Sequence, residues 1–154
     1  MATLREAVEE MLAKDGWVFA PVEGQETLAM GYKGENGTWS CYAHVDQERG
    51  TFVFYSVTDR PVPERHRAAV AEYLTLANFG LVLGNFELDL GDGETRFKTS
   101  AELGAAEPSL DLLRPIVYAN IAAMDRYLPG IDGVSRGSMT PKEAIAACEG
   151  GTVQ

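Results

Sequence analysis

Three short runs of alternating apolar and polar residues shape the hydrophobic pattern in the first third of the chain. They are Thr27–Lys33, Thr38–Val45 and Thr51–Thr58, and all are rich in aromatic and β-branched residues, which favour strands. Two turn signals, Gly34–Gly37 and Gln47–Gly50, separate the runs, and the Asn-Gly pair in the first readily adopts the positive φ of a tight hairpin. The pattern predicts an antiparallel meander with one face that must be buried.

The alternation also assigns side chains to the two faces of this meander. In the second run, one face carries Trp39, Cys41, Ala43 and Val45. In the third run, Phe52 and Phe54 share one face, while Val53, Tyr55 and Val57 share the other, so neither face is fully polar. Either both faces are partly covered, or one of them meets a partner.

Helical patterns lie before and after the meander. Leu4–Lys14 has apolar residues at helical spacing and begins with the capping-box pattern of Thr3 and Glu6. Trp17–Ala20 is a short apolar run, predicted to be extended and ended by Pro21. A second helix is predicted from Pro63 or Glu64 to Ala77, and its buried stripe contains Val70, Tyr73, Leu74 and Ala77.

A hairpin and two further helices complete the predicted elements. Asn85–Leu90 and Thr95–Thr99 alternate as strands around a Gly-rich turn. Ser109–Leu128 is predicted to be a helix that is apolar on two sides, kinked by or starting near Pro115 and ended by Pro129-Gly130. A linker at Gly133–Ser138 leads to a short helix from Pro141 to about Cys148, opened by a second capping box at Thr140.

These elements predict an α+β domain with a five-stranded antiparallel sheet in the order α-βββ-α-ββ-α, followed by a short C-terminal helix. The chain of 154 residues fits a single domain, with its core at about residues 3–130 and the linker and terminal helix at 131–154. The amphipathic helices are expected to cover the apolar face of the sheet.

The charge and composition restrict the classes of partner. The chain has 13 basic and 23 acidic residues, a formal charge of −10, which disfavours binding to nucleic acid or to an anionic membrane surface. No signal peptide or membrane-spanning run is visible, so the protein is expected to be soluble and cytoplasmic, with Cys41 and Cys148 reduced.

Candidate active-site residues are few. His44 and His66 have no second ligand or base at a recognised spacing, and Cys41 is most simply a small core residue. The acidic segment Asp89–Glu94 lacks the spacing of a calcium loop, and Gly80–Gly84 lacks the pattern of a phosphate loop. The sequence therefore predicts no catalytic, cofactor-binding or metal-binding residues and no cofactor.

The element order resembles the YbjN-like family, whose fold is similar to that of the type III secretion chaperones. The segments that carry the resemblance lie between Leu4 and Ala147: Gly50–Ser56 with Pro61–Pro63, Val70–Asn78, Gly84–Asp89 with Thr95–Lys98, and Thr140–Ile145. The resemblance implies no cofactor and no catalytic residues, a homodimer, and a role in binding or regulating another protein.

The function predicted first is a non-enzymatic protein-interaction module, chaperone-like or regulatory, that captures a partner segment by sheet-edge addition or in a helix–sheet groove. The predicted partner-binding residues are Trp17, Met30, Trp39, Phe52 and Phe54. The alternative is that helices and a second copy of the chain cover them, and it is favoured because exposed apolar patches on monomers are uncommon. The predicted dimer interface contains Val70, Tyr73, Phe86 and Leu88.

The alternative hypothesis is a small-molecule sensor or an enzyme with a pocket between the third helix and the sheet. Polar groups for that pocket would come from Tyr42, His44, Tyr55 and Asp59.

Overall fold

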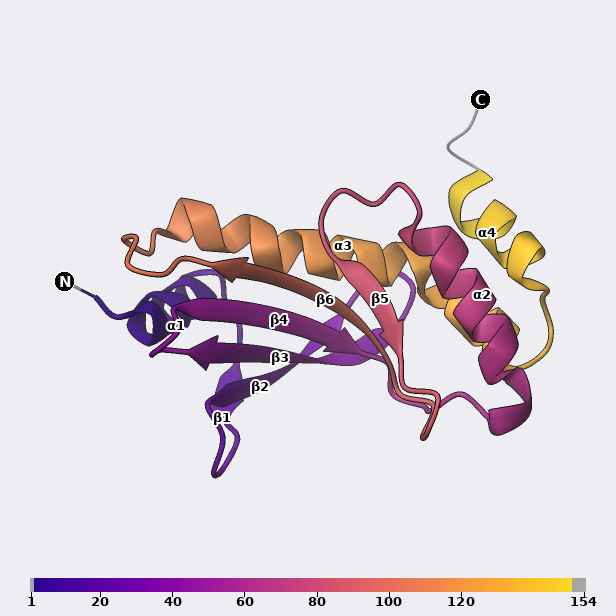
Figure 1. Cartoon of the computed structure of the whole chain (residues 1–154), viewed down its shortest axis with the longest axis horizontal. Coiled ribbons are helices and arrows are strands. Elements are labelled where there is room, and N and C mark those ends of the chain that lie inside the picture. The colour runs from indigo at the N-terminus through magenta and orange to yellow at the C-terminus, as the bar shows by residue number, and fades with distance from the viewer. Residues whose placement is uncertain (1, 151–154) are drawn as a thin grey trace.

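The computed structural model describes residues 2–150 and is a single sheet with its helices on one face and at one end (Figure 1). The strands are β1 (Phe19–Pro21), β2 (Thr27–Lys33), β3 (Thr38–Asp46), β4 (Thr51–Val57), β5 (Asn85–Leu88) and β6 (Thr95–Glu102). The helices are α1 (Leu4–Lys14), α2 (Arg67–Asn78), α3 (Leu110–Ser135) and α4 (Pro141–Glu149), with a short 3-10 turn at Glu64–His66 before α2. None of the helices in the described part of the chain has the length and apolarity that a membrane span requires.

The sheet has six strands in the order β1-β2-β3-β4-β6-β5, and every neighbouring pair is antiparallel. The antiparallel meander and the second hairpin are as predicted, but the prediction of five strands was wrong. The extra strand is the run that ends at Pro21, where Phe19 pairs with Met30 and lengthens the sheet beyond β2. This edge strand is only three residues long because a turn follows at once, in which the Val22 N–H donates to the carbonyl of Thr27 at 2.8 Å.

One face of the sheet is apolar and lies under α1 and α3, as the alternation predicted. Its side chains have almost no exposed surface: Leu28, Trp39, Cys41, Ala43, Val45, Phe52, Phe54 and Phe97. The opposite face carries side chains that remain partly exposed, and no helix packs on it (Figure 1). The face of β4 that carries Phe52 and Phe54 is therefore covered by the chain's own helices.

The longest helix, α3, does not end at Pro129-Gly130, so the predicted helix end was wrong. Pro129 leaves the carbonyl of Asp125 without its helical partner, and the side-chain amide of Asn36 donates to that carbonyl at 2.8 Å. The Asp125 carboxylate in turn accepts the backbone N–H groups of Glu35 and Asn36. The β2–β3 turn thus supplies the hydrogen bonds that allow the helix to continue.

Gly130 is used inside α3 for close packing. A Cβ atom at this position would lie 2.1 Å from the hydroxyl oxygen of Tyr73, so only glycine lets α2 approach the helix here. The last turns of α3 bury Ile131 and Val134, which extends the core past the predicted limit of residue 130. The predicted capping box at Thr140 is present at the start of α4, and the predicted segment beyond residue 150 lies outside the described residues.

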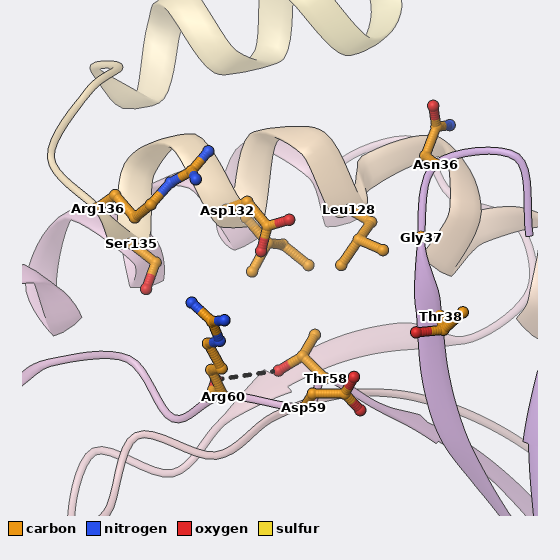
Figure 2. Close-up of a pocket in the computed structure, with 11 residues that line it drawn as sticks. Asn36, Gly37, Thr38, Thr58, Asp59, Arg60, Leu128, Asp132, Ser135 and Arg136 are labelled. Atoms are coloured by element: carbon orange, nitrogen blue, oxygen red, sulfur yellow. Dashed lines mark hydrogen bonds between the residues drawn. The ribbon is translucent and has the colours of Figure 1, made fainter. Parts of the chain in front are cut away.

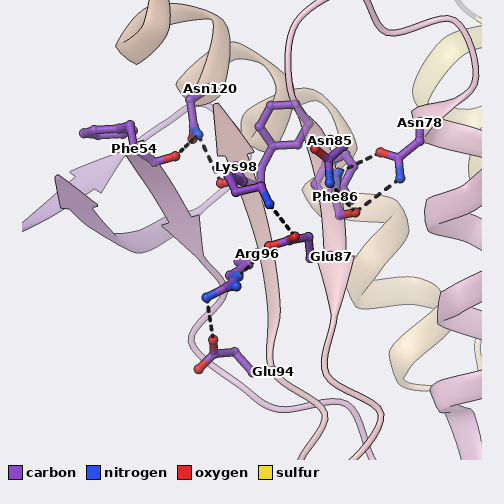
Figure 3. Close-up of polar contacts among 10 residues, drawn as sticks. Phe54, Asn78, Asn85, Phe86, Glu87, Glu94, Arg96, Lys98 and Asn120 are labelled. Carbon is purple, nitrogen blue, oxygen red and sulfur yellow. Dashed lines mark hydrogen bonds and ion pairs between the residues drawn. The ribbon is translucent and has the colours of Figure 1, made fainter. Parts of the chain in front are cut away.

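A buried amide joins α3 to the middle of the sheet. The Nδ2 group of Asn120 donates to the carbonyls of Phe54 at 2.8 Å and Phe97 at 3.0 Å, which lie on the neighbouring strands β4 and β6 (Figure 3). The Thr99 hydroxyl donates to the carbonyl of Ile116 at 2.7 Å. These contacts fix the position of the helix along the strands, which apolar packing alone does not specify.

We expect Asn120→Ala to lower the free energy of unfolding by about 1–3 kcal/mol, because buried carbonyls then lose a donor that water cannot replace. Chemical denaturation measures the change. Leu112→Ala is the matched control, since this exposed residue of the same helix should change stability by less than about 0.5 kcal/mol. Equal effects of the two substitutions would contradict the role assigned to Asn120.

An ion pair joins the end of α1 to the start of α3. The Arg114 guanidinium donates to both carboxylate oxygens of Asp15 at 2.9–3.1 Å, and the Tyr118 hydroxyl donates to the same group at 3.0 Å. The hydrogen bonds from Arg114 hold the pKa of Asp15 below its ordinary value of 3.8, despite the partial burial of the carboxylate. The folded state therefore favours the ionised form of Asp15.

This lowered pKa predicts an acid-sensitive contribution to stability. The contribution is complete above the ordinary carboxyl pKa and is lost as the pH falls through the lower pKa of the folded state. We expect Asp15→Asn to lower the melting temperature at pH 7 and to reduce the steepness of the loss below about pH 4. Thermal unfolding of both proteins from pH 7 to pH 2.5 tests this, and parallel curves across that range would contradict it.

Candidate functional site

The predicted partner-binding residues do not form an exposed surface. Met30, Trp39, Phe52 and Phe54 are buried beneath α1 and α3. Trp17 is partly buried, with its ring 5.4 Å from that of Tyr32 and 6.0 Å from that of Phe54. The prediction was therefore wrong about accessibility, because the chain's own helices cover this face, as the alternative reading allowed.

The predicted dimer interface is also largely inside the chain. Val70, Tyr73 and Phe86 are buried where α2, α3 and β5 meet, and the Tyr73 hydroxyl donates to the carbonyl of Tyr127 at 2.8 Å. Only Leu88 keeps part of its surface exposed. These residues are thus not available as a surface for a second copy, while the homodimer itself stays a prediction.

The polar residues proposed for a sensor pocket are divided between two places. Tyr42, His44 and Tyr55 lie on the open face of the sheet, on the side away from α3, around a shallow hollow of about 410 Å³. Asp59 lies elsewhere, in a recess beside α3. The structure therefore does not bring the four together between the third helix and the sheet, because residues that alternate with the core face must point away from it.

On the open face, the polar groups largely satisfy one another. The hydroxyl of Thr27 is 3.0 Å from Nδ1 of His44, and the Arg96 guanidinium lies 4.4 Å from the centre of the Tyr55 ring. Glu87 accepts from Arg96 and from Lys98, each at 2.8 Å (Figure 3). Burial alone would raise the pKa of Glu87, but the hydrogen bonds from Lys98 and Arg96 hold it below the ordinary value.

Catalytic chemistry has little support among the described residues. Cys41 is fully buried, and burial raises the pKa of its thiol to about 11, so a reactive thiolate is disfavoured. The hydroxyl of Ser56 lies 3.6 Å from the Cys41 sulfur. Over residues 2–150, no three His, Cys, Asp or Glu side chains converge as ligands for a metal ion.

An exposed apolar loop joins α2 to β5. Its side chains are among the most exposed large apolar groups in the described structure: Phe79 at 90%, Val82 at 94% and Leu83 at 50%. Leu76, one helical turn before Phe79, is also exposed. The loop projects at the edge of the molecule beyond the end of α2 (Figure 1). This loop was not among the predicted sites, although the apolar run between Gly80 and Gly84 is a sequence signal for it.

The base of this apolar loop is held by Asn78. The Asn78 side chain accepts from the backbone N–H of Phe86 at 2.7 Å and donates to the carbonyl of Phe86 at 3.2 Å (Figure 3). This pairing imitates a neighbouring strand and occupies the free edge of β5 at that residue. At the other end, Gly84 has a φ of +77° and lies against the carbonyl of Lys98, where a Cβ would be only 2.6 Å away.

A charged recess lies between the second half of α3 and the loop that follows β4 (Figure 2). Its volume is about 320 Å³. The loop contributes Asp59 and Arg60, and α3 contributes Asp132 and Arg136, above the buried side chains of Leu128 and Ile131. Partial burial raises the pKa of Asp132, and the nearby Arg136 and Arg60 offset this rise only in part.

Comparison with known sequences matches residues 4–133 to the profile of the YbjN family, which is described as a putative bacterial sensory transduction regulator. The chain belongs to the YbjN family. The match covers the elements from α1 to α3, including the apolar loop and nearly all of the recess. The search of curated proteins gave no significant match.

Two solved structures share the fold of this chain. YbjN from Escherichia coli, described as a putative transcription regulator, superimposes with a TM-score of 0.61 at 12% identity over 79% of this chain and 85% of that one. An uncharacterised protein from Methanothermobacter thermautotrophicus gives a TM-score of 0.56 at 15% identity over 84% of this chain and 96% of that one. At these identities the likeness concerns the fold alone.

We expect Asn78→Ala to open the edge of β5 in this YbjN protein. The amide hydrogen of Phe86 should then exchange with solvent at least tenfold faster, since it loses its acceptor, and unfolding should cost about 1–2 kcal/mol less. Hydrogen exchange followed by NMR measures this residue directly. Thr75→Ala is the control, because its hydroxyl bonds only to its own helix. Unchanged exchange at Phe86 would contradict the assignment.

Proposed function

We propose that this YbjN-family chain is a non-enzymatic regulator that docks its apolar loop onto a segment of another protein. The observation that carries the proposal is the exposure of Phe79 and Val82 on a loop whose base is fixed by Asn78. Contiguous exposed apolar side chains on a soluble protein mark interaction sites. A fixed base reduces the conformational entropy that binding would otherwise cost.

The charge of the chain indicates the chemistry of the partner. Ten excess negative charges disfavour direct contact with a nucleic-acid backbone, so a regulator of this kind would act through a protein. An apolar partner segment flanked by basic residues complements both the loop and the acidic surface. Family membership supports a regulatory role in general, and the partner is the additional claim of the proposal.

The energetics limit what the loop can do alone. Burial of a fully exposed large apolar side chain gains about 1.5–3 kcal/mol, so Phe79, Val82 and the half-exposed Leu83 together gain about 4–8 kcal/mol. Loss of translational and rotational freedom on association costs about 4–15 kcal/mol. The loop therefore supports a weak, reversible contact, which becomes tight only if charged contacts around it contribute.

The mode of binding differs from strand addition at β5. Asn78 already pairs with the free edge of that strand, so docking through the side chains of the loop is favoured over backbone pairing there. A likeness to the type III secretion chaperones, a homodimeric assembly and a cytoplasmic location belong to this proposal. All three fit a small acidic binding protein whose own helices cover the apolar face of its sheet.

Site-specific photocrosslinking in the native host tests the proposal. With a photoreactive phenylalanine analogue at position 79, we expect a covalent adduct with one predominant protein. Val82→Asp in the same chain should reduce that adduct about tenfold, because a charge cannot enter an apolar interface without a large desolvation cost.

Val18 supplies the matched control, since it is 89% exposed on the opposite edge of the sheet, near β1. The analogue at position 18 should not form the adduct, and Val18→Asp should leave the adduct at position 79 unchanged. The proposal fails if position 79 gives no adduct, gives the same adducts as position 18, or crosslinks only to a second copy of the chain.

A further inference from the structure

Two side chains of opposite charge face each other across the charged recess. Arg60 extends from the loop after β4 toward α3, and Asp132 extends from α3 toward the loop (Figure 2). The space around them, about 320 Å³, is at the lower end of the range for small-molecule sites.

The charged groups of the recess have no direct partners within residues 2–150. None of the side chains of Asp59, Arg60, Asp132 and Arg136 makes a hydrogen bond or an ion pair there. Elsewhere the chain joins such groups directly, as in the pair of Arg114 with Asp15 at 2.9 Å. The recess thus keeps opposite charges close enough to influence the pKa of Asp132 but separated by open space.

We propose that the recess binds a small zwitterion of amino-acid size, with its ammonium group at Asp132 and its carboxylate at Arg60. A carboxylate suits the planar fork of a guanidinium, and an ammonium group suits a carboxylate acceptor. The buried side chains of Leu128 and Ile131 form an apolar floor against which an aliphatic side chain of the ligand packs.

The balance of charge in the recess disfavours ligands that carry a single charge. Its four charged side chains sum to zero, since two aspartates oppose two arginines. An anion without an ammonium group would be attracted by Arg60 but repelled by Asp59 and Asp132. A cation without a carboxylate would be attracted by the two aspartates but repelled by Arg60 and Arg136. Only a ligand with both charges pairs the groups of both signs.

The neutral polar groups agree with this placement. The Ser135 hydroxyl borders the recess and can accept from an ammonium group or donate to a carboxylate. The Thr58 hydroxyl donates to the carbonyl of Thr95, so it can serve a ligand only as an acceptor. Asn36 also borders it, but its side-chain amide donates to the carbonyl of Asp125 and points away from Arg60 and Asp132 (Figure 2). The ligand is therefore held mainly by the side chains of Arg60 and Asp132.

Thermal-shift measurements with each common amino acid, followed by calorimetric titration of the strongest, test the proposal, which does not depend on the apolar loop. At about 10 mM, we expect aliphatic amino acids to raise the melting temperature, because a ligand that binds only the folded state stabilises it. The N-acetyl and the amide derivatives of the same amino acid should bind at least tenfold more weakly, since each lacks one charge.

Substitutions locate the binding. Arg60→Gln and Asp132→Asn should each weaken it at least tenfold, while the exposed controls Arg49→Gln and Glu48→Gln should not change it. NMR shift mapping of the unaltered protein should place the changes at residues 58–60 and 131–136. Absence of binding by every amino acid, equal binding of the N-acetyl derivative, or binding that survives both recess substitutions overturns the proposal.

Discussion

The contact between α3 and the apolar face of the sheet is the constraint on which the rest of the structure depends. Alternation along β3 and β4 places large apolar side chains on one face, and α3 is long enough to cover the strands from β4 to β5. Apolar burial drives this association but leaves the helix free to slide. Asn120 removes that freedom, because its donor group reaches carbonyls of two adjacent strands. The position of α3 then determines where α2, α4 and the recess can lie.

Most of the fold was predictable from local signals. The meander, the capping boxes of α1 and α4 and the buried stripe of α2 follow from alternation, helical spacing and capping residues, which act over a few positions. The errors concern long-range contacts. Pro129-Gly130 is a strong local signal for a helix end, yet Asn36 and Tyr73, distant in sequence, supply the hydrogen bond and the close packing that let α3 continue. The three-residue strand at Phe19 likewise exists only because Met30 pairs with it.

The functional surfaces were less predictable for the same reason. Both faces of the meander carry aromatic and other apolar residues, and sequence alone does not say which face the helices cover. The candidate sites consist instead of residues that no periodic pattern selects. Phe79 and Val82 belong to a loop between two elements. Arg60 and Asp132 lie on the same recess only because the chain folds back through the second half of the domain. Candidate sites of this kind depend on tertiary contacts that no local pattern encodes.

The pairing of Asn78 with the edge strand β5 bears on self-association of the protein at high concentration. An open sheet offers two rows of unpaired backbone groups to other molecules, and exposed rows of this kind seed edge-to-edge polymerisation. Here the side-chain amide of Asn78 pairs with the edge strand β5 at Phe86. The edge strand on the other side, β1, is only three residues long and ends in proline. These two features oppose fibril growth by strand addition along the sheet, while the exposed side chains of the apolar loop stay accessible.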